Sequence, residues 1–276
     1  MENSISYARS FRATNFNEYI GNEDIKETLM RTLGHSRPQS ILLMGSSGCG
    51  KTTMARIVAK IYNCEDPSSE KGACDECMSC QLFNEYIRTG NTEMLPDIYE
   101  IDASDTSGKK DIDLMLQTME YPAMGGAWKV YIIDEAHLLS KEAMGRLLKS
   151  LEEPKEGVLI ILCTTDPDDL LDTIRNRCQL QLKVTKPGTQ DIMKLLKRVC
   201  LSEDKGYDMA GLRMLASISN NVVRDSLNNV ERVINSRGDA TAKSVSEEFK
   251  QVSDKYIFDF YEAYQKEDYV GYINVL

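Results

Sequence analysis

A glycine-rich loop has the residue types and spacing that bind the phosphates of a nucleoside triphosphate. Residues 45–52 satisfy the pattern G-x-x-x-x-G-K-[ST]. The glycines let the backbone fold around a triphosphate and direct its N–H groups at the oxygens. Lys51 adds positive charge for the β- and γ-phosphates, and the Thr52 hydroxyl can hold Mg²⁺. The predicted nucleotide contacts are Gly45, Ser46, Ser47, Gly48, Cys49, Gly50, Lys51, Thr52 and Thr53.

Four cysteines that follow this loop have the spacing of a metal site. Cys64, Cys74, Cys77 and Cys80 form the pattern C-x9-C-x2-C-x2-C. The two C-x2-C steps let neighbouring thiolates converge on one ion, and the polar stretch at 65–73 brings back the fourth. Four thiolates suit a closed tetrahedral Zn²⁺ site that has no open position for catalysis. An iron–sulfur cluster, or four cysteines without a metal, are the alternatives.

Two acids at the end of an apolar segment are candidates for the other half of the nucleotide site. The segment 129–133 is followed by Asp134 and Glu135. A nucleotide site needs a carboxylate at a strand end, close to the Mg²⁺ that Thr52 holds, and Asp134 fits that role. Glu135 could polarise the attacking water as a general base. The alternative is an ordinary strand with an acidic turn. The string Asp-Glu-Ala-His also occurs in helicases, but such a helicase resembles two tandem ATPase cores and this chain has length for one.

A further apolar segment, residues 158–163, ends in Thr164, Thr165, Asp166 and Pro167. Strand ends in an open α/β sheet line the ligand crevice, so a hydroxyl here could respond to the γ-phosphate or to the attacking water. The same four residues also read as a turn and a helix N-cap. The residues themselves leave both interpretations open.

These side chains need a set of elements that brings strand ends together. Short apolar runs predict strands near 41–44, 98–101, 130–134, 158–163 and 179–183, and helical spacing follows the glycine-rich loop over 52–62. Alternating strands and helices imply an α/β fold with a parallel sheet. The expected fold class is therefore a P-loop parallel-sheet core with a zinc-knuckle insertion.

A boundary signal, Lys186-Pro187-Gly188-Thr189, separates this core from a helical region. We expect a nucleotide-binding core at 1–184 with the zinc insertion at 64–80, and a small helical lid at 185–242. The aromatic-rich segment 243–276 cannot bury its rings by itself. The family that the motifs described below resemble has a helical collar at this place, and the resemblance implies that 243–276 is the start of this oligomerisation domain, truncated or unusually short.

Composition excludes several classes of protein. The chain has 276 residues and a formal net charge of −10. A protein that coats duplex DNA is usually basic, so any nucleic-acid contact must be local or supplied by partner chains. No apolar run is long enough to span a membrane, and without a signal pattern the expected location is cytoplasmic. Cysteines outside the cluster are expected to be packed thiols rather than disulfides: Cys49, Cys163, Cys178 and Cys200.

Together these motifs resemble one family, the gamma/tau subunits of bacterial DNA polymerase III, which are AAA+ ATPases of the sliding-clamp loader. The resemblance runs from about Tyr7 to the end. It rests on the loop GSSGCGKTT, the four-cysteine insertion, EIDAS at 100–104, KVYIIDEAHLLS at 129–140, LLKSLEEP at 147–154 and CTTDP at 163–167. Few other ATPases combine a four-cysteine knuckle with LLKSLEEP.

The resemblance implies roles for further residues. Thr164 and Thr165 match the first sensor motif. Asn176-Arg177-Cys178 matches the family's Ser-Arg-Cys element, whose arginine reaches ATP held by a neighbouring subunit. Without the resemblance, Arg177 would be read as a surface ion-pair partner. Arg224 matches the second sensor, an arginine on a lid helix that contacts the γ-phosphate in its own chain.

The segment before the loop resembles the part of the family that flanks the adenine. Arg12, Tyr19 and Ile20 would lie at the base. The family usually has Tyr-Arg-Pro where this chain has Phe-Arg-Ala at 11–13, and Ser where it has Asn176. The missing proline concerns the base contacts and not ATP binding. These departures fit a divergent homologue, such as one carried by a phage or a plasmid.

The function that the resemblance implies is that of a motor subunit which loads a sliding clamp onto primer–template DNA. Its partners would be other loader subunits in a pentameric ring, the clamp, and DNA held by its backbone, with Lys109, Lys110 and Lys141 as candidate contacts that are otherwise solvated lysines. Its cofactors would be ATP, Mg²⁺ and Zn²⁺. One alternative is a passive subunit that holds nucleotide without turning it over. A stand-alone helicase is the other.

Overall fold

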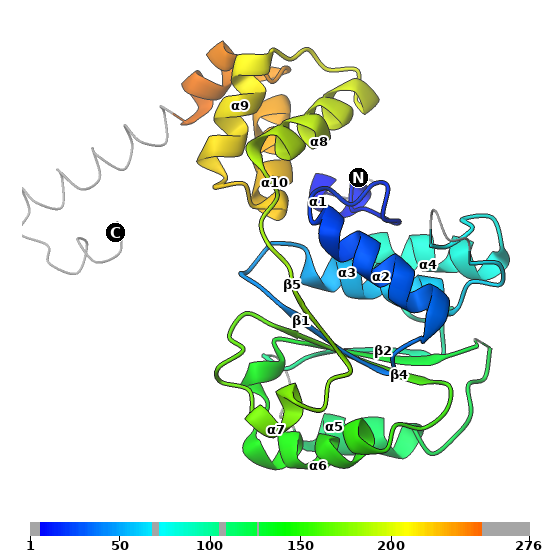
Figure 1. Ribbon diagram of the computed structural model, residues 1–276. Helices are drawn as coiled ribbons and strands as arrows, with labels where there is room; N and C mark the ends of the chain where they lie inside the picture. Colours follow the sequence, from blue (N-terminus) through cyan, green and yellow to red (C-terminus); the bar gives the residue numbers. More distant parts are fainter. Residues whose placement is uncertain (1–5, 68–71, 105–108, 126, 250–276) are drawn as a thin grey trace, which may run out of the picture. The chain divides into compact units, whose positions relative to one another are not determined.

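A computed structural model describes residues 6–67, 72–104, 109–125 and 127–249 (Figure 1). The chain divides into two compact units, and the division falls between Gly188 and Thr189. Each unit has its own packed interior. The first carries the glycine-rich loop, the acids and the cysteines, and the second is helical.

The first unit is built on a five-stranded sheet in which every pair of neighbours is parallel, in the order β2-β3-β4-β1-β5. The predicted strands are confirmed: β1 is Ser40–Met44, β2 Ile98–Asp102, β3 Lys129–Asp134, β4 Val158–Thr164 and β5 Leu180–Lys183. Because β4 pairs with both β1 and β3, the strand that ends in Thr164 lies between the strand of the glycine-rich loop and the strand of the acids.

Helices cover both faces of the sheet (Figure 1). On one face lie α2 (Glu23–His35), α3 (Lys51–Tyr62) and α4 (Met78–Thr89), and on the other α5 (Lys109–Thr118), α6 (Lys141–Glu152) and α7 (Asp172–Arg175). Short helices at Tyr7–Ser10 (α1) and Ala136–Leu138 (η1) complete the unit.

Alternation of side chains along the strands explains the two layers. Leu43 packs in the core on the α3 side, whereas its neighbour Leu42 packs in the core on the α6 side. All seven residues of β4 are buried. Strands covered on both faces are continuously apolar, which is why these segments were recognisable as apolar runs.

The second unit contains α8 (Thr189–Ser202), α9 (Met209–Ile218) and α10 (Val223–Arg237). Its helices bury their apolar faces, with Leu195 and Leu196 of α8 and Leu227 and Val230 of α10 in its interior. The segment that follows α10 is tied back to it, because the Glu248 carboxylate accepts hydrogen bonds from Arg232 and Ser236 at 2.8 Å each. The remainder of the predicted segment 243–276, from residue 250 on, lies outside the described residues. Within the described part of the chain, no helix has the length and apolar character needed to cross a bilayer.

Candidate nucleotide site and metal centre

The glycine-rich loop joins β1 to α3, so it lies at the carboxyl end of a central strand and at a helix N-terminus. Gly50 has a φ of 105°, and a Cβ there would lie 2.5 Å from the hydroxyl oxygen of Tyr19. At Gly45 a Cβ would lie 2.1 Å from the carbonyl oxygen of Val184. Both positions therefore require glycine. Strand, loop and helix N-terminus together form the kind of anion site that binds phosphate.

Lys51 is held within this loop. It is 5% exposed, and its ammonium donates to the carbonyl oxygens of Gly45 at 2.9 Å and Ser46 at 3.2 Å. Ser46 and Ser47 are exposed at the tip of the loop, whereas Gly48, Thr52 and Thr53 are half-buried and Cys49 is buried. The predicted nucleotide contacts thus comprise the loop from Gly45 to Gly50 and the first three residues of α3, Lys51 to Thr53.

The structure brings the predicted Mg²⁺ ligands together from positions 82 residues apart. The Thr52 hydroxyl donates to a carboxylate oxygen of Asp134 at 2.5 Å, and the backbone N–H of Glu135 donates to the other at 3.0 Å. Burial raises the pKa of the Asp134 carboxyl, and the hydrogen bond from Thr52 opposes that rise. A hydroxyl and a carboxylate in contact, beside the glycine-rich loop, are an oxygen donor set that suits Mg²⁺.

Glu135 follows Asp134 in a left-handed backbone conformation, with a φ of 47°. Side chains other than glycine adopt this region rarely, and such residues are frequent at functional sites. The Thr165 hydroxyl donates to the Glu135 carboxylate at 2.9 Å. Thr164 is fully buried, and its hydroxyl donates to the carbonyl oxygen of Asp166 at 2.9 Å. Of the two candidate sensor residues, Thr165 is therefore the one in contact with the predicted general base.

His137 is a member of this cluster that the sequence did not single out. Its Nδ1 lies 3.1 Å from the Thr164 hydroxyl oxygen and 3.5 Å from the Glu135 carboxylate. The signal was present in the string Asp-Glu-Ala-His. The role of His137 could not be read from that string, because Thr164 comes within reach of His137 only when β3 and β4 are neighbours.

The predicted base-side residues separate into two environments. Tyr19 is 5% exposed and its hydroxyl donates to the carbonyl oxygen of Cys49 in the glycine-rich loop at 3.3 Å. Burial raises the pKa of Tyr19, so the phenol stays neutral. Ile20 follows it and is half-buried. The Arg12 guanidinium instead donates to the carbonyl oxygen of Ile87 in α4 at 3.3 Å.

Arg177 lies near the amino end of β1, whereas the glycine-rich loop follows the carboxyl end of the same strand. Its carbonyl oxygen accepts a hydrogen bond of 3.3 Å from Ser40, the first residue of β1. The loop follows Met44 at the other end of that strand, about 13 Å away at 3.3 Å per residue. The Arg177 guanidinium forms an ion pair with Glu152 of the LLKSLEEP segment. The lid arginine, Arg224, is exposed in the first turn of α10.

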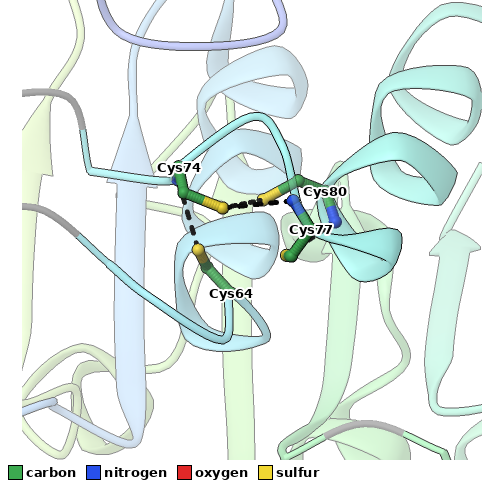
Figure 2. A group of neighbouring side chains, drawn as sticks. All are labelled: Cys64, Cys74, Cys77 and Cys80. Carbon is green, nitrogen blue, oxygen red and sulfur yellow. Dashed lines mark hydrogen bonds between the residues drawn. The ribbon is translucent and has the colours of Figure 1, made fainter.

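The four predicted metal ligands converge (Figure 2). The sulfur atoms of Cys64, Cys74, Cys77 and Cys80 all lie within 4.8 Å of one another. Those of Cys74 and Cys80 are 3.8 Å apart, which is about the edge of a tetrahedron with Zn–S bonds of about 2.3 Å. Backbone N–H groups within the knuckle donate to the sulfurs of Cys64, Cys74 and Cys77 at 3.2–3.4 Å. The donor set therefore fits a closed Zn²⁺ site.

The other four cysteines are free, buried thiols, as predicted: Cys49, Cys163, Cys178 and Cys200.

Removing a metal from the cysteine knuckle is expected to destabilise the first unit. Metal binding that closes a loop contributes directly to folding, and this loop connects α3 to α4. We expect the purified chain to carry about one Zn²⁺ and a strong chelator to lower its melting temperature. A Cys77→Ser variant should lose the metal, whereas Cys200→Ser, in α8, should keep it. Purified protein without metal, or a melting temperature insensitive to the chelator, would contradict this.

Two buried cations of α3 were also missed by the sequence analysis. Arg56 donates to both carboxylate oxygens of Glu100 in β2, at 2.9 Å and 2.6 Å. Lys60 is fully buried. In both cases the signal in the sequence was a charged residue among the apolar residues of a helix. A charge that is buried in this way requires partners. The identity of those partners could not be read from the sequence.

Comparisons with known proteins agree with this geometry. A family model described as "DNA polymerase III, delta subunit" matches residues 21–186. The DNA polymerase III subunit gamma of Buchnera aphidicola subsp. Acyrthosiphon pisum is 34% identical over 263 residues, which cover 95% of this chain and 70% of that protein. The DNA polymerase III subunits tau of Bacillus subtilis and Escherichia coli are 33% and 32% identical, and the match covers 84% and 93% of this chain. It spans only 40% and 39% of those two proteins.

Among solved structures, the Thermotoga maritima RuvB Holliday junction branch migration motor superposes with a TM-score of 0.65 at 19% identity, over 92% of this chain and 80% of that one. The fold is therefore that of a RuvB-like AAA+ P-loop protein, as the motifs predicted.

Proposed function

The chain belongs to the DNA polymerase III gamma/tau subunit family, and we propose that it is an ATP-hydrolysing motor subunit of a sliding-clamp loader. The observation that carries the proposal is the contact between Thr52 and Asp134, with Glu135 and Thr165 hydrogen-bonded beside them. These contacts support the proposal because they bring a candidate Mg²⁺ ligand pair next to a candidate general base. A subunit that only holds nucleotide would use Asp134 for Mg²⁺ but would not need a general base at Glu135.

Each of these side chains has a defined role in the proposed reaction. Lys51 and the backbone N–H groups of the loop hold the β- and γ-phosphates. Mg²⁺ bound by Thr52 and Asp134 would neutralise negative charge on the phosphate oxygens. Glu135 accepts a proton from the attacking water, and Thr165 orients the Glu135 carboxylate by donating to it. Arg224 would contact the γ-phosphate from the lid of the same chain.

Arg177 is proposed to act on the nucleotide of a neighbouring subunit. Its position at the amino end of β1 supports this, because an arginine side chain cannot span the length of the strand to its own glycine-rich loop. In a ring, the amino end of β1, where Arg177 lies, is available to an adjacent chain. A guanidinium delivered there would stabilise charge on the transferring phosphoryl group.

The proposed partners are those of a loader. ATP bound between subunits would tie them into a pentameric ring that holds the sliding clamp open and contacts the backbone of primer–template DNA. Hydrolysis would then release the closed clamp. The candidate DNA contact Lys141 is exposed at the start of α6, whereas the side chains of Lys109 and Lys110 lie outside the described part of the chain. A cytoplasmic location goes with this function.

The proposal is tested by the ATPase rate of the chain alone, with partner loader subunits, and with the clamp and primed DNA added. We expect the complete mixture to give the highest rate, because each site needs an arginine from its neighbour. Duplex DNA without a primer end serves as the control. A rate that the full mixture does not raise would refute the loader function, and duplex unwinding by the lone chain would favour a helicase.

A further inference from the structure

Lys60 connects the cysteine knuckle to the segment that packs on the phosphate loop. Its side chain is fully buried, and its ammonium donates to the carbonyl oxygen of Thr14 at 3.0 Å, to the side-chain oxygen of Asn84 at 2.5 Å, and to the Asp75 carboxylate. A lysine has three N–H donors, and each has an acceptor from a different segment. Lys60 lies on α3, the same helix that begins with Lys51.

The knuckle supplies one of these acceptors. Asp75 lies between Cys74 and Cys77 and has a left-handed backbone conformation, with a φ of 64°. One of its carboxylate oxygens accepts from Lys60, and the other accepts from the side-chain amide of Asn15 at 3.1 Å. A single carboxylate of the metal-ligand loop therefore contacts Asn15 of the base-side segment directly and Thr14 of the same segment through Lys60.

The base-side segment, which is the segment predicted to flank the adenine, in turn contacts the glycine-rich loop. The backbone carbonyl of Asn15 accepts from the N–H of Tyr19 at 3.1 Å, and its side-chain oxygen accepts from the N–H of Glu18 at 2.9 Å. The Tyr19 hydroxyl then donates to Cys49, and its ring fills the space beside Gly50. Tyr19 is thus placed against the phosphate loop by the same turn that Asp75 holds.

From these contacts we propose that metal binding at the cysteine knuckle and nucleotide binding at the glycine-rich loop are coupled, with Asp75, Lys60 and Asn15 as the positioning residues. The inference rests on the proposed nucleotide site. Without the metal, the loop of Cys74 and Cys77 loses its closure, and Asp75 loses its fixed place. A fully buried ammonium that loses an acceptor is costly, so the turn that carries Tyr19 rearranges with it.

Coupling between two binding sites is reciprocal, which makes the inference testable without measuring hydrolysis. The equilibrium Zn²⁺ affinity of the full chain is measured by competition with a chromogenic chelator that leaves Mg²⁺ free, with and without saturating ADP. We expect ADP to raise the Zn²⁺ affinity about fivefold or more, the lower end of typical coupling. Removal of Zn²⁺ should weaken binding of a fluorescent ADP analogue by the same factor.

Two variants on opposite sides of the connection identify its route. Asp75→Asn removes the charge that faces Lys60, and Asn15→Ala removes the amide that faces Asp75. Both should bind Zn²⁺ and ADP with the two affinities no longer linked. Glu76→Gln is the matched control, because Glu76 is the adjacent, exposed carboxylate of the same loop, and it should keep the wild-type coupling. Thermal melts confirm that each variant is folded.

The outcomes separate this inference from the function on which it rests. If ADP binds the wild-type chain but leaves its Zn²⁺ affinity unchanged, the coupling is refuted while the nucleotide site stands. Equal coupling in the wild type, Asp75→Asn and Asn15→Ala refutes the route through these residues. If ADP fails to bind the wild-type chain at all, the proposed function is refuted, and the coupling with it.

Discussion

A Glu135→Gln variant is expected to hydrolyse ATP about 10²–10⁴-fold more slowly than the wild type, the range that a general base contributes. Glutamine still accepts the hydrogen bond from Thr165 but cannot take a proton from water. Because Asp134, Thr52 and Lys51 are untouched, ATP affinity should stay close to that of the wild type. The measurement is single-turnover hydrolysis in the assembled loader, with nucleotide affinity determined separately.

Glu142→Gln is the matched control for this experiment. Glu142 is an exposed carboxylate in the first turn of α6, so its replacement removes the same charge from the same chain. It should hydrolyse ATP at the wild-type rate. Two results would contradict the assignment of Glu135: a variant rate equal to a normal wild-type rate, or a wild-type rate already near zero, which would favour a subunit that binds nucleotide passively.

An Arg177→Ala variant is expected to lower the turnover of a reconstituted ring by about 10³-fold or more, the effect of losing an arginine supplied to a neighbouring site. ATP affinity of the isolated chain should be unchanged, because Arg177 lies at the far end of β1 from its own glycine-rich loop. Loss of the ion pair with Glu152 should change stability little, since both side chains are partly exposed.

Mixing experiments sharpen this prediction. When Arg177→Ala chains are combined with Lys51→Ala chains, activity should return wherever an intact arginine faces an intact phosphate loop. Arg146→Ala is the control, because Arg146 is also partly exposed and ion-paired within its own chain, with Asp113. Turnover of the Arg177→Ala ring at the wild-type rate would refute a split active site.

Much of the fold followed from local patterns in the sequence. Strands covered on both faces must be apolar throughout, so β1, β3 and β4 were recognisable within one residue of their observed ends. The cysteine knuckle was equally accessible, because C-x2-C steps bring thiolates together almost regardless of the surrounding fold.

Within the candidate site, one side-chain contact could be anticipated from the sequence and others could not. The pairing of Thr52 with Asp134 was anticipated, since the chemistry of Mg²⁺ requires it. The distinction between Thr164, the last residue of β4, and Thr165, which follows it, was not, because it depends on which neighbouring groups each hydroxyl meets. The partners of Lys60 and His137 were equally hidden. Helical or strand periodicity tells which side of an element is buried, and not which distant segment covers it.

The amino-acid sequence alone determined the phosphate-loop motif, the pattern of four cysteines and the order of strands and helices along the chain, because each of these is carried by residues that are close in sequence. The tertiary structure alone decided the order of strands across the sheet. That order places β4 between the glycine-rich loop and the acids and brings His137 to Thr164. It could not be read from the chain because spatial order is set by packing between segments far apart in sequence.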